Sequence, residues 1–69
     1  MALTLRQWRR AKEISQEKMA QILGVHVNTY QNWEEDPEKI SIGKAMAIAE
    51  VFGISLDDIT FRKEEAEQR

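Results

Sequence analysis

Cysteine is absent from this 69-residue chain, and histidine and proline occur once each. Without cysteine there is no disulfide framework and no thiolate metal site. The lone histidine argues against a metal centre or a histidine-dependent catalytic site, because either would need further ligands or a paired nucleophile. We therefore expect a protein that is not an enzyme and that uses no metal, cofactor or small-molecule substrate.

Long apolar runs are missing as well. No segment approaches the roughly 20 apolar residues of a membrane-spanning helix, and the first residues lack the pattern of a signal peptide. These absences predict a cytoplasmic protein that makes no use of a membrane.

An excess of positive charge is the third feature that the sequence lacks. Ten Lys or Arg stand against twelve Asp or Glu, so the net charge is −2, and the pI is near 5.3. Nonspecific nucleic-acid binding requires a positive field, which this composition does not supply. The charge is uneven: residues 1–44 hold seven basic and six acidic residues (+1), whereas residues 45–69 hold three and six (−3). The acidic excess therefore lies mainly in the last third of the chain.

The length allows a single small domain, which we expect over residues 1–61, followed by a charged tail over residues 62–69. A core of this size supplies only about 3–5 kcal/mol by itself. Well-capped helices, tight packing or a partner subunit must stabilise the fold.

Apolar spacing and capping residues predict five short helices and no strand. The first follows Thr4, an N-cap that forms a capping box with Gln7, and its core stripe is Leu5, Trp8 and Ala11. The later helices are expected to begin after Ser15, His26, Ser41 and Ser55, and glycines are expected to end the second and the fourth at Gly24 and Gly53.

The stretch from Ser15 to Glu34 has the pattern of a helix-turn-helix, because two short amphipathic segments meet at Gly24. In the second segment, roughly residues 27–35, helical projection separates two faces. Thr29, Tyr30 and Trp33 should face the core. The opposite face carries mostly amides and no Lys or Arg: Val27, Asn28, Gln31, Asn32 and Glu35.

Joint spacing of several motifs makes the chain resemble the DNA-binding domain of phage repressors of the Cro and lambda-repressor type, also called the xenobiotic-response-element type. The matching segments, within residues 5–60, are Ile14-Ser15-Gln16-Glu17, Met19-Ala20, Leu23-Gly24-Val25, Asn28-Thr29-Tyr30 with Trp33-Glu34, and the run from Ala49 to Ile59. The resemblance implies an all-α, five-helix fold in which helices 2 and 3 form the helix-turn-helix and helix 3 reads a DNA major groove.

The same resemblance implies roles for single residues. Base contacts are expected from Val27, Asn28, Gln31 and Asn32; asparagine can pair with adenine and valine methyls can meet a thymine methyl, so the site should lean towards A·T. Gln16 matches a glutamine that meets a phosphate and braces the reading helix, and Arg9 and Glu34 match a charged pair that ties helix 1 to it. Contacts to the DNA backbone are expected from Gln16, His26, Thr29, Lys39, Ser41 and Lys44. The contact from His26 should strengthen when its ring is protonated.

These features favour a sequence-specific transcriptional regulator, specifically a Cro-like repressor encoded by a phage or prophage. It would bind double-stranded DNA as a homodimer, with Ile59 and Phe61 as apolar contacts of the dimer. The acidic turn at residues 34–38 departs from the family, which often has glycine and basic residues there, so we expect modest affinity and a shallow salt dependence.

Two alternatives stay open. The outer amide face could be a solvated surface, and Lys39 and Lys44 are as compatible with solvent as with phosphate. A protein-interaction or antitoxin-like module on the same fold would suit the acidic turn and the low pI.

Overall fold

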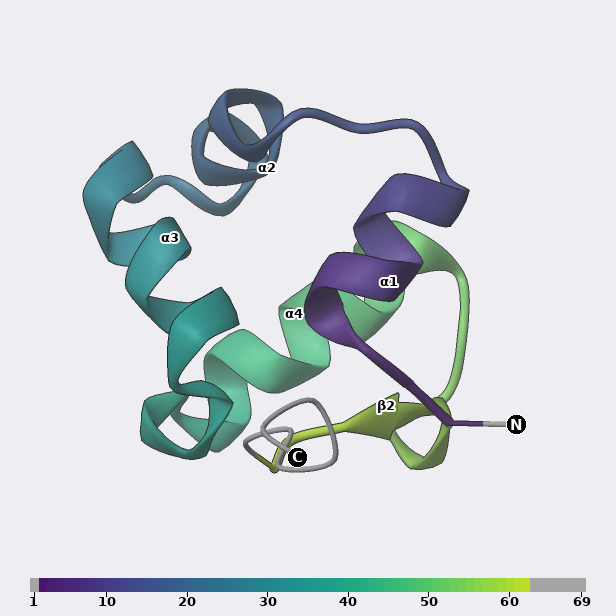
Figure 1. Cartoon of the computed structure of the whole chain (residues 1–69). Coiled ribbons are helices and arrows are strands. Elements are labelled where there is room, and N and C mark those ends of the chain that lie inside the picture. Colours follow the sequence, from purple (N-terminus) through teal and green to yellow (C-terminus); the bar gives the residue numbers. More distant parts are fainter. Residues whose placement is uncertain (1, 63–69) are drawn as a thin grey trace, which may run out of the picture.

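A computed structural model describes residues 2–62 of the chain. In this part the chain forms four α-helices, a parallel pair of two-residue strands and two 3₁₀ turns (Figure 1). The elements, in order, are β1 (Leu3–Thr4), α1 (Leu5–Ala11), α2 (Gln16–Leu23), α3 (Val27–Glu35), the turn Pro37–Lys39, α4 (Ile42–Phe52), the turn Leu56–Asp58 and β2 (Ile59–Thr60). No helix among residues 2–62 is long and apolar enough to cross a membrane. The predicted tail begins at Arg62, and its residues 63–69 lie outside the described part.

Capping residues begin the helices where the sequence predicted. The Thr4 hydroxyl accepts from the Gln7 backbone N–H at 3.2 Å, and the Gln7 side chain accepts from the Thr4 N–H at 2.9 Å. The Ser15 and Ser41 hydroxyls each accept from the backbone N–H three residues on, at the starts of α2 and α4. These bonds satisfy N–H groups that have no partner inside their own helix.

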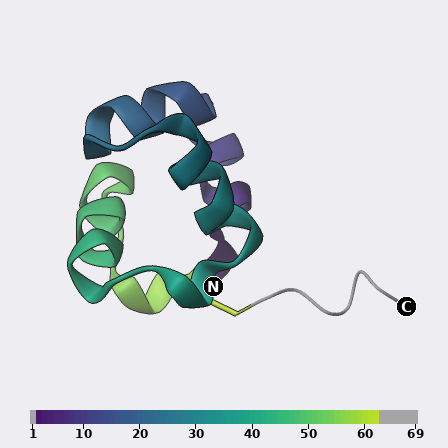
Figure 2. The same ribbon diagram turned by 90° about the vertical axis from the view of Figure 1, so that its left-hand side faces the viewer.

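Gly24 follows α2 with a φ of 72°, in the left-handed region that glycine adopts without a Cβ penalty. The backbone therefore changes direction sharply between α2 and α3, and these two helices pack closely against each other. α4 lies on one side of the molecule and α1 on the other, with α2 crossing the top of the view (Figure 2). The helix-turn-helix predicted over residues 15–34 is thus present.

The core lies between the helices and is centred on four side chains that are almost completely buried: Leu5, Met19, Tyr30 and Ile48. Two inward assignments were wrong. Thr29 is exposed, because the buried side of α3 is centred on Tyr30 and includes Trp33 and Val27, three residues away on either side. Ala11 is also exposed, because it is the last residue of α1.

The C-terminal segment differs from the prediction of a fifth helix. Ser55 does cap a helical turn, but the turn lasts only three residues, Leu56–Asp58, and the chain then becomes extended. Ile59 and Thr60 pair in parallel with Leu3 and Thr4. Both residues of β2 are β-branched and Ile59 packs into the core, which favours the strand. Strands of two residues leave no alternating pattern, so the sequence did not reveal them.

Candidate nucleic-acid interface

The start of α3 is held by an unusual cap. The Nδ1 atom of His26 accepts a hydrogen bond from the Asn28 backbone N–H at 3.1 Å. This bond requires an unprotonated Nδ1, so the proton of the neutral ring lies on Nε2. A phosphate contact from His26 would therefore come from Nε2–H. Protonation of Nδ1 would remove the cap, which opposes the strengthening expected from the sequence.

The outer face of α3 presents the amide side chains that helical projection placed there. Asn28, Gln31 and Asn32 are exposed, and Glu35 is exposed beside them. Val27 is half-buried and packs against the core, so only part of its side chain reaches the surface. The structure thus brings four predicted base-contact residues onto one helix, while their contact with DNA stays a prediction.

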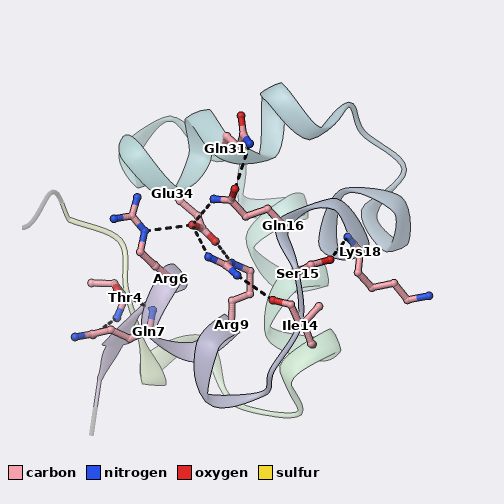
Figure 3. A network of polar contacts seen from close by, with 10 residues as sticks. All are labelled: Thr4, Arg6, Gln7, Arg9, Ile14, Ser15, Gln16, Lys18, Gln31 and Glu34. Carbon is pink, nitrogen blue, oxygen red and sulfur yellow. Dashed lines mark hydrogen bonds and ion pairs between the residues drawn. The ribbon is translucent and has the colours of Figure 1, made fainter.

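A buried carboxylate lies behind this face. The Glu34 side chain has no exposed surface, and its two oxygens accept from side chains of α1 and α2 (Figure 3). Arg9 donates through Nε to Oε2 at 2.6 Å, and through Nη2 to Oε1 at 3.4 Å. Arg6 Nε lies 3.4 Å from the same Oε1. The predicted pair of Arg9 and Glu34 is therefore confirmed, and Arg6 is a partner that the sequence did not indicate.

Arg9 also joins the first two helices. Its Nη1 donates to the Ile14 carbonyl at 2.9 Å, in the loop that leads from α1 into α2 (Figure 3). A single guanidinium thus bonds the α1–α2 loop and α3 from its position on α1, because its planar donors point in several fixed directions.

The titration of Glu34 reflects this arrangement. Burial by itself would raise the pKa of the Glu34 carboxyl, but the hydrogen bonds from Arg9 and Gln16 outweigh burial and hold the pKa below its ordinary value. The pKa of the neighbouring Tyr30 hydroxyl is raised, first by burial and then by the Glu34 carboxylate. This hydroxyl finds no hydrogen-bond partner among the described residues. At neutral pH the cluster therefore holds an ionised glutamate beside a neutral tyrosine.

Gln16 connects the buried carboxylate with the outer face. Its Nε2 donates to Glu34 Oε1 at 2.9 Å, and its Oε1 accepts from Gln31 Nε2 at 3.2 Å (Figure 3). The brace that the family resemblance implied is thus present, and Gln31 is its second anchor. Gln31 and Glu34 lie three residues apart on one side of α3, which makes such a bridge possible. The resemblance had indicated Gln16 as the brace, but it did not indicate that Gln31 and Glu34 are its partners.

Some of the predicted cationic and hydroxyl contacts already have partners within the chain. Lys44 Nζ donates to the Leu23 carbonyl at 3.2 Å, at the end of α2. Lys39 Nζ lies 3.8 Å from the Asp36 carboxylate in an exposed pair. The Ser41 hydroxyl caps α4. Thr29 is exposed on α3. Ser41 and Lys44 thus have partners in the chain, whereas Thr29 and Lys39, whose side chain is 79% exposed, are accessible.

The acidic turn after α3 remains an exposed negative feature. Glu35 and Glu38 are exposed, and Asp36 is half-buried. Across residues 2–62 no group of three or more acidic or histidine side chains is arranged to hold a metal ion. The exposed negative charge thus lies at the C-terminal end of α3 and in the turn after it, away from the first two turns of the helix.

An apolar groove with a volume of about 490 Å³ begins at the end of the acidic turn. Its lining comes from the segment after α3, the start of α4 and the C-terminal segment: Pro37, Glu38, Ile40, Ile42, Ala45, Leu56 and Phe61. Ile42 is 70% exposed. The two residues expected at a dimer surface are separated, because Phe61 lines the groove whereas Ile59 is only 5% exposed and belongs to the core. Ile59 therefore offers little surface to a partner.

Comparison with known proteins agrees with this geometry over most of the chain. A family model described as helix-turn-helix matches residues 5–59. This range begins with α1 and ends at the first residue of β2. Searches of curated proteins and of solved structures found no match.

Proposed function

Because the chain belongs to the Cro and lambda-repressor type of helix-turn-helix DNA-binding domains and is therefore a DNA-binding transcription regulator, we propose that it is a sequence-specific repressor. In this proposal α3 enters the major groove of an operator, and occupancy of the promoter represses transcription. The protein would be a small Cro-like regulator of the kind that phages and prophages encode. It would require no cofactor and carry out no chemistry.

The observation that carries this proposal is the exposed amide face on the first turns of α3. Asn28 and Asn32 are exposed and lie one turn apart. Neither side chain makes a hydrogen bond to another described residue, so both amides are available to base edges. An asparagine amide matches the N7 acceptor and N6 donor of adenine in the major groove. These positions therefore favour A·T pairs.

Contacts to the DNA backbone would be few and mostly uncharged. The candidates are the remaining N–H of Gln16, the Nε2–H of His26 and the hydroxyls of Thr29 and Ser41. The positive end of the α3 dipole adds to them. Lys39 and Lys44 are the two lysines among the residues expected at the backbone, so few counterions would be released on binding and the affinity should depend weakly on salt.

A second copy of the chain is the proposed occupant of the apolar groove. Residues 63–69, Lys-Glu-Glu-Ala-Glu-Gln-Arg, include one apolar residue and cannot fill an apolar groove. Two copies related by a twofold axis would place two reading helices on half-sites about one turn apart, which multiplies the specificity of a small module. Ile42 and Phe61 would then become buried in the dimer.

Selection from randomised duplexes tests the function. The protein is incubated with the pool at low salt and the retained duplexes are sequenced; an enriched, near-palindromic, A·T-leaning motif is expected. Asn28→Ala should then cost about 1–3 kcal/mol on that motif and relax the preference at one base position. Gln21→Ala, an exposed amide on α2, is the matched control and should bind like wild type.

Absence of any enriched motif would refute the proposal. It would favour the alternative in which the same fold binds a protein partner through the acidic turn and the groove. An equal loss on all sequences in Asn28→Ala would refute direct reading by this residue.

A further inference from the structure

We propose that Gln31 acts on DNA through Gln16, as a positioning residue that fixes the side chain expected to meet a phosphate. The inference rests on the proposed DNA-binding function and assigns Gln31 a role other than the base contact expected from the sequence. It follows from the hydrogen bonds that join α2 to α3 (Figure 3).

The first step is the fixed end of the Gln16 amide. Gln16 Nε2 donates to Glu34 Oε1 at 2.9 Å, and the Glu34 side chain is fully buried. Arg9, itself only 12% exposed, holds the other oxygen of this carboxylate at 2.6 Å. The acceptor of the Gln16 bond therefore cannot move without disturbing the core, which fixes the position of the Gln16 nitrogen.

The second step concerns the orientation of the same amide. Its oxygen accepts from Gln31 Nε2 at 3.2 Å. Rotation of the Gln16 amide by half a turn would place its oxygen against the Glu34 carboxylate, which only accepts hydrogen bonds, so Glu34 sets the orientation of the amide. Gln31 gives the Gln16 oxygen a second anchor and restricts the side chain to this position.

This orientation is the one that suits a phosphate. An amide can offer an anion either an N–H, which attracts it, or a carbonyl oxygen, which repels it. Here the oxygen is occupied by Gln31, and one N–H of the nitrogen remains after the bond to Glu34. Gln16 thus presents a donor whose rotamer is already restricted before DNA arrives, and binding loses less conformational entropy.

The rival role of Gln31 is direct reading of a base. In Figure 3 the Gln31 oxygen points away from Gln16. The second N–H of the Gln31 amide does not bond to Gln16 either, so both groups could meet a base edge. Direct reading and positioning are both sterically open to such a side chain, but they predict different responses to substitution.

Binding of the selected duplex by Gln31→Met, Gln16→Met and the double variant separates these roles. Methionine keeps the length of the side chain and removes the hydrogen bond. If Gln31 positions Gln16, Gln31→Met should weaken binding about three- to tenfold, the range of one net hydrogen bond. The loss should be equal across duplexes that each carry one altered base pair. In the Gln16→Met background, Gln31→Met should cause no further loss.

A backbone readout completes the test. Ethylation of the phosphate next to Gln16 should interfere with binding by wild type. This interference should disappear in Gln16→Met and be reduced in Gln31→Met, in which Glu34 still holds the Gln16 nitrogen. Asn32→Ala serves as the control, because a base reader should lose affinity at one base position and retain the interference. Gln31 is exposed, so Gln31→Met should melt like wild type.

Three results would overturn the inference. The first is a loss in Gln31→Met that is confined to one base pair and adds to that of Gln16→Met. The second is unchanged affinity in Gln31→Met. The third is a wild-type protein that selects no duplex, which refutes the proposed function as well and is thereby distinguished from the first two.

Discussion

Replacement of Arg9 by methionine tests the charged cluster that joins α1, α2 and α3. The substitution keeps most of the apolar stem and removes the guanidinium that donates twice to Glu34 and once to the Ile14 carbonyl. The Glu34 carboxylate would remain in a site with no exposed surface. The effect on stability should therefore come mainly from an ionised group that has lost its strongest partner.

The magnitude can be estimated from the partners that remain. Removal of one member of a buried ion pair costs about 3–5 kcal/mol. Arg6 and Gln16 would still donate to Glu34 Oε1, so the lower end, about 3 kcal/mol, is expected here. For a domain of this size, 1 kcal/mol corresponds to a shift in Tm of about 4–8 °C, so the melting temperature should fall by about 12–24 °C. A core that supplies only ~3–5 kcal/mol would then be close to unfolding at room temperature.

Urea unfolding followed by far-UV circular dichroism measures this loss. Arg10→Met is the matched control, because Arg10 is the neighbouring arginine of α1, is exposed and bonds to no other described side chain. Its free energy of unfolding should stay within about 0.5 kcal/mol of wild type. Adding Glu34→Gln to Arg9→Met should recover part of the loss, because the unpaired charge is then removed. A loss in Arg9→Met no larger than that in Arg10→Met would refute the reasoning.

Two further predictions concern the same cluster and the groove. The pKa of Glu34 is lowered in the folded chain, so its contribution to stability is fully present above the unfolded value of about 4.3 and is lost as the pH falls through the folded value. Below about pH 4.3 the free energy of unfolding should therefore change less steeply with pH in Glu34→Gln than in the exposed control Glu35→Gln. Equal slopes in the two variants would contradict this. Phe61→Lys should convert a sedimenting dimer into a monomer and abolish cooperative half-site binding, whereas Gln21→Lys should not. A wild-type monomer at all concentrations, or an unchanged dimer in Phe61→Lys, would exclude the groove as the dimer surface.

Local signals carried most of the fold prediction. Thr4, Ser15 and Ser41 begin helices because a hydroxyl cap is a property of a few adjacent residues. Gly24 ends α2 for the same kind of local reason. The short strands escaped prediction because their pairing joins Leu3 to Ile59 across almost the whole chain, and no local pattern encodes it. A two-residue strand is too short to show alternation.

The candidate site was predictable to the extent that it depends on one helix. Helical projection placed Asn28 and Asn32 on the outer face of α3, where they lie. It could not show that Gln16 contacts both Gln31 and Glu34, because that depends on how α2 packs against α3. The engagement of Lys44 by the Leu23 carbonyl escaped prediction for the same reason. The position of a lysine near a helix end thus depends on packing between helices, which charge counts do not describe.

The pairing of β1 with β2 has a consequence for the order of folding. It closes a loop from residue 3 to residue 59, whereas α1, α2 and α3 are joined by loops of a few residues. Loop closure costs more entropy as the loop lengthens, and contacts between distant segments slow folding. The two strands should therefore join after the helices have docked, and they should separate first when the domain opens. We therefore expect the backbone amides of this strand pair to exchange hydrogen earlier than those of the helices, although Ile59 packs into the core.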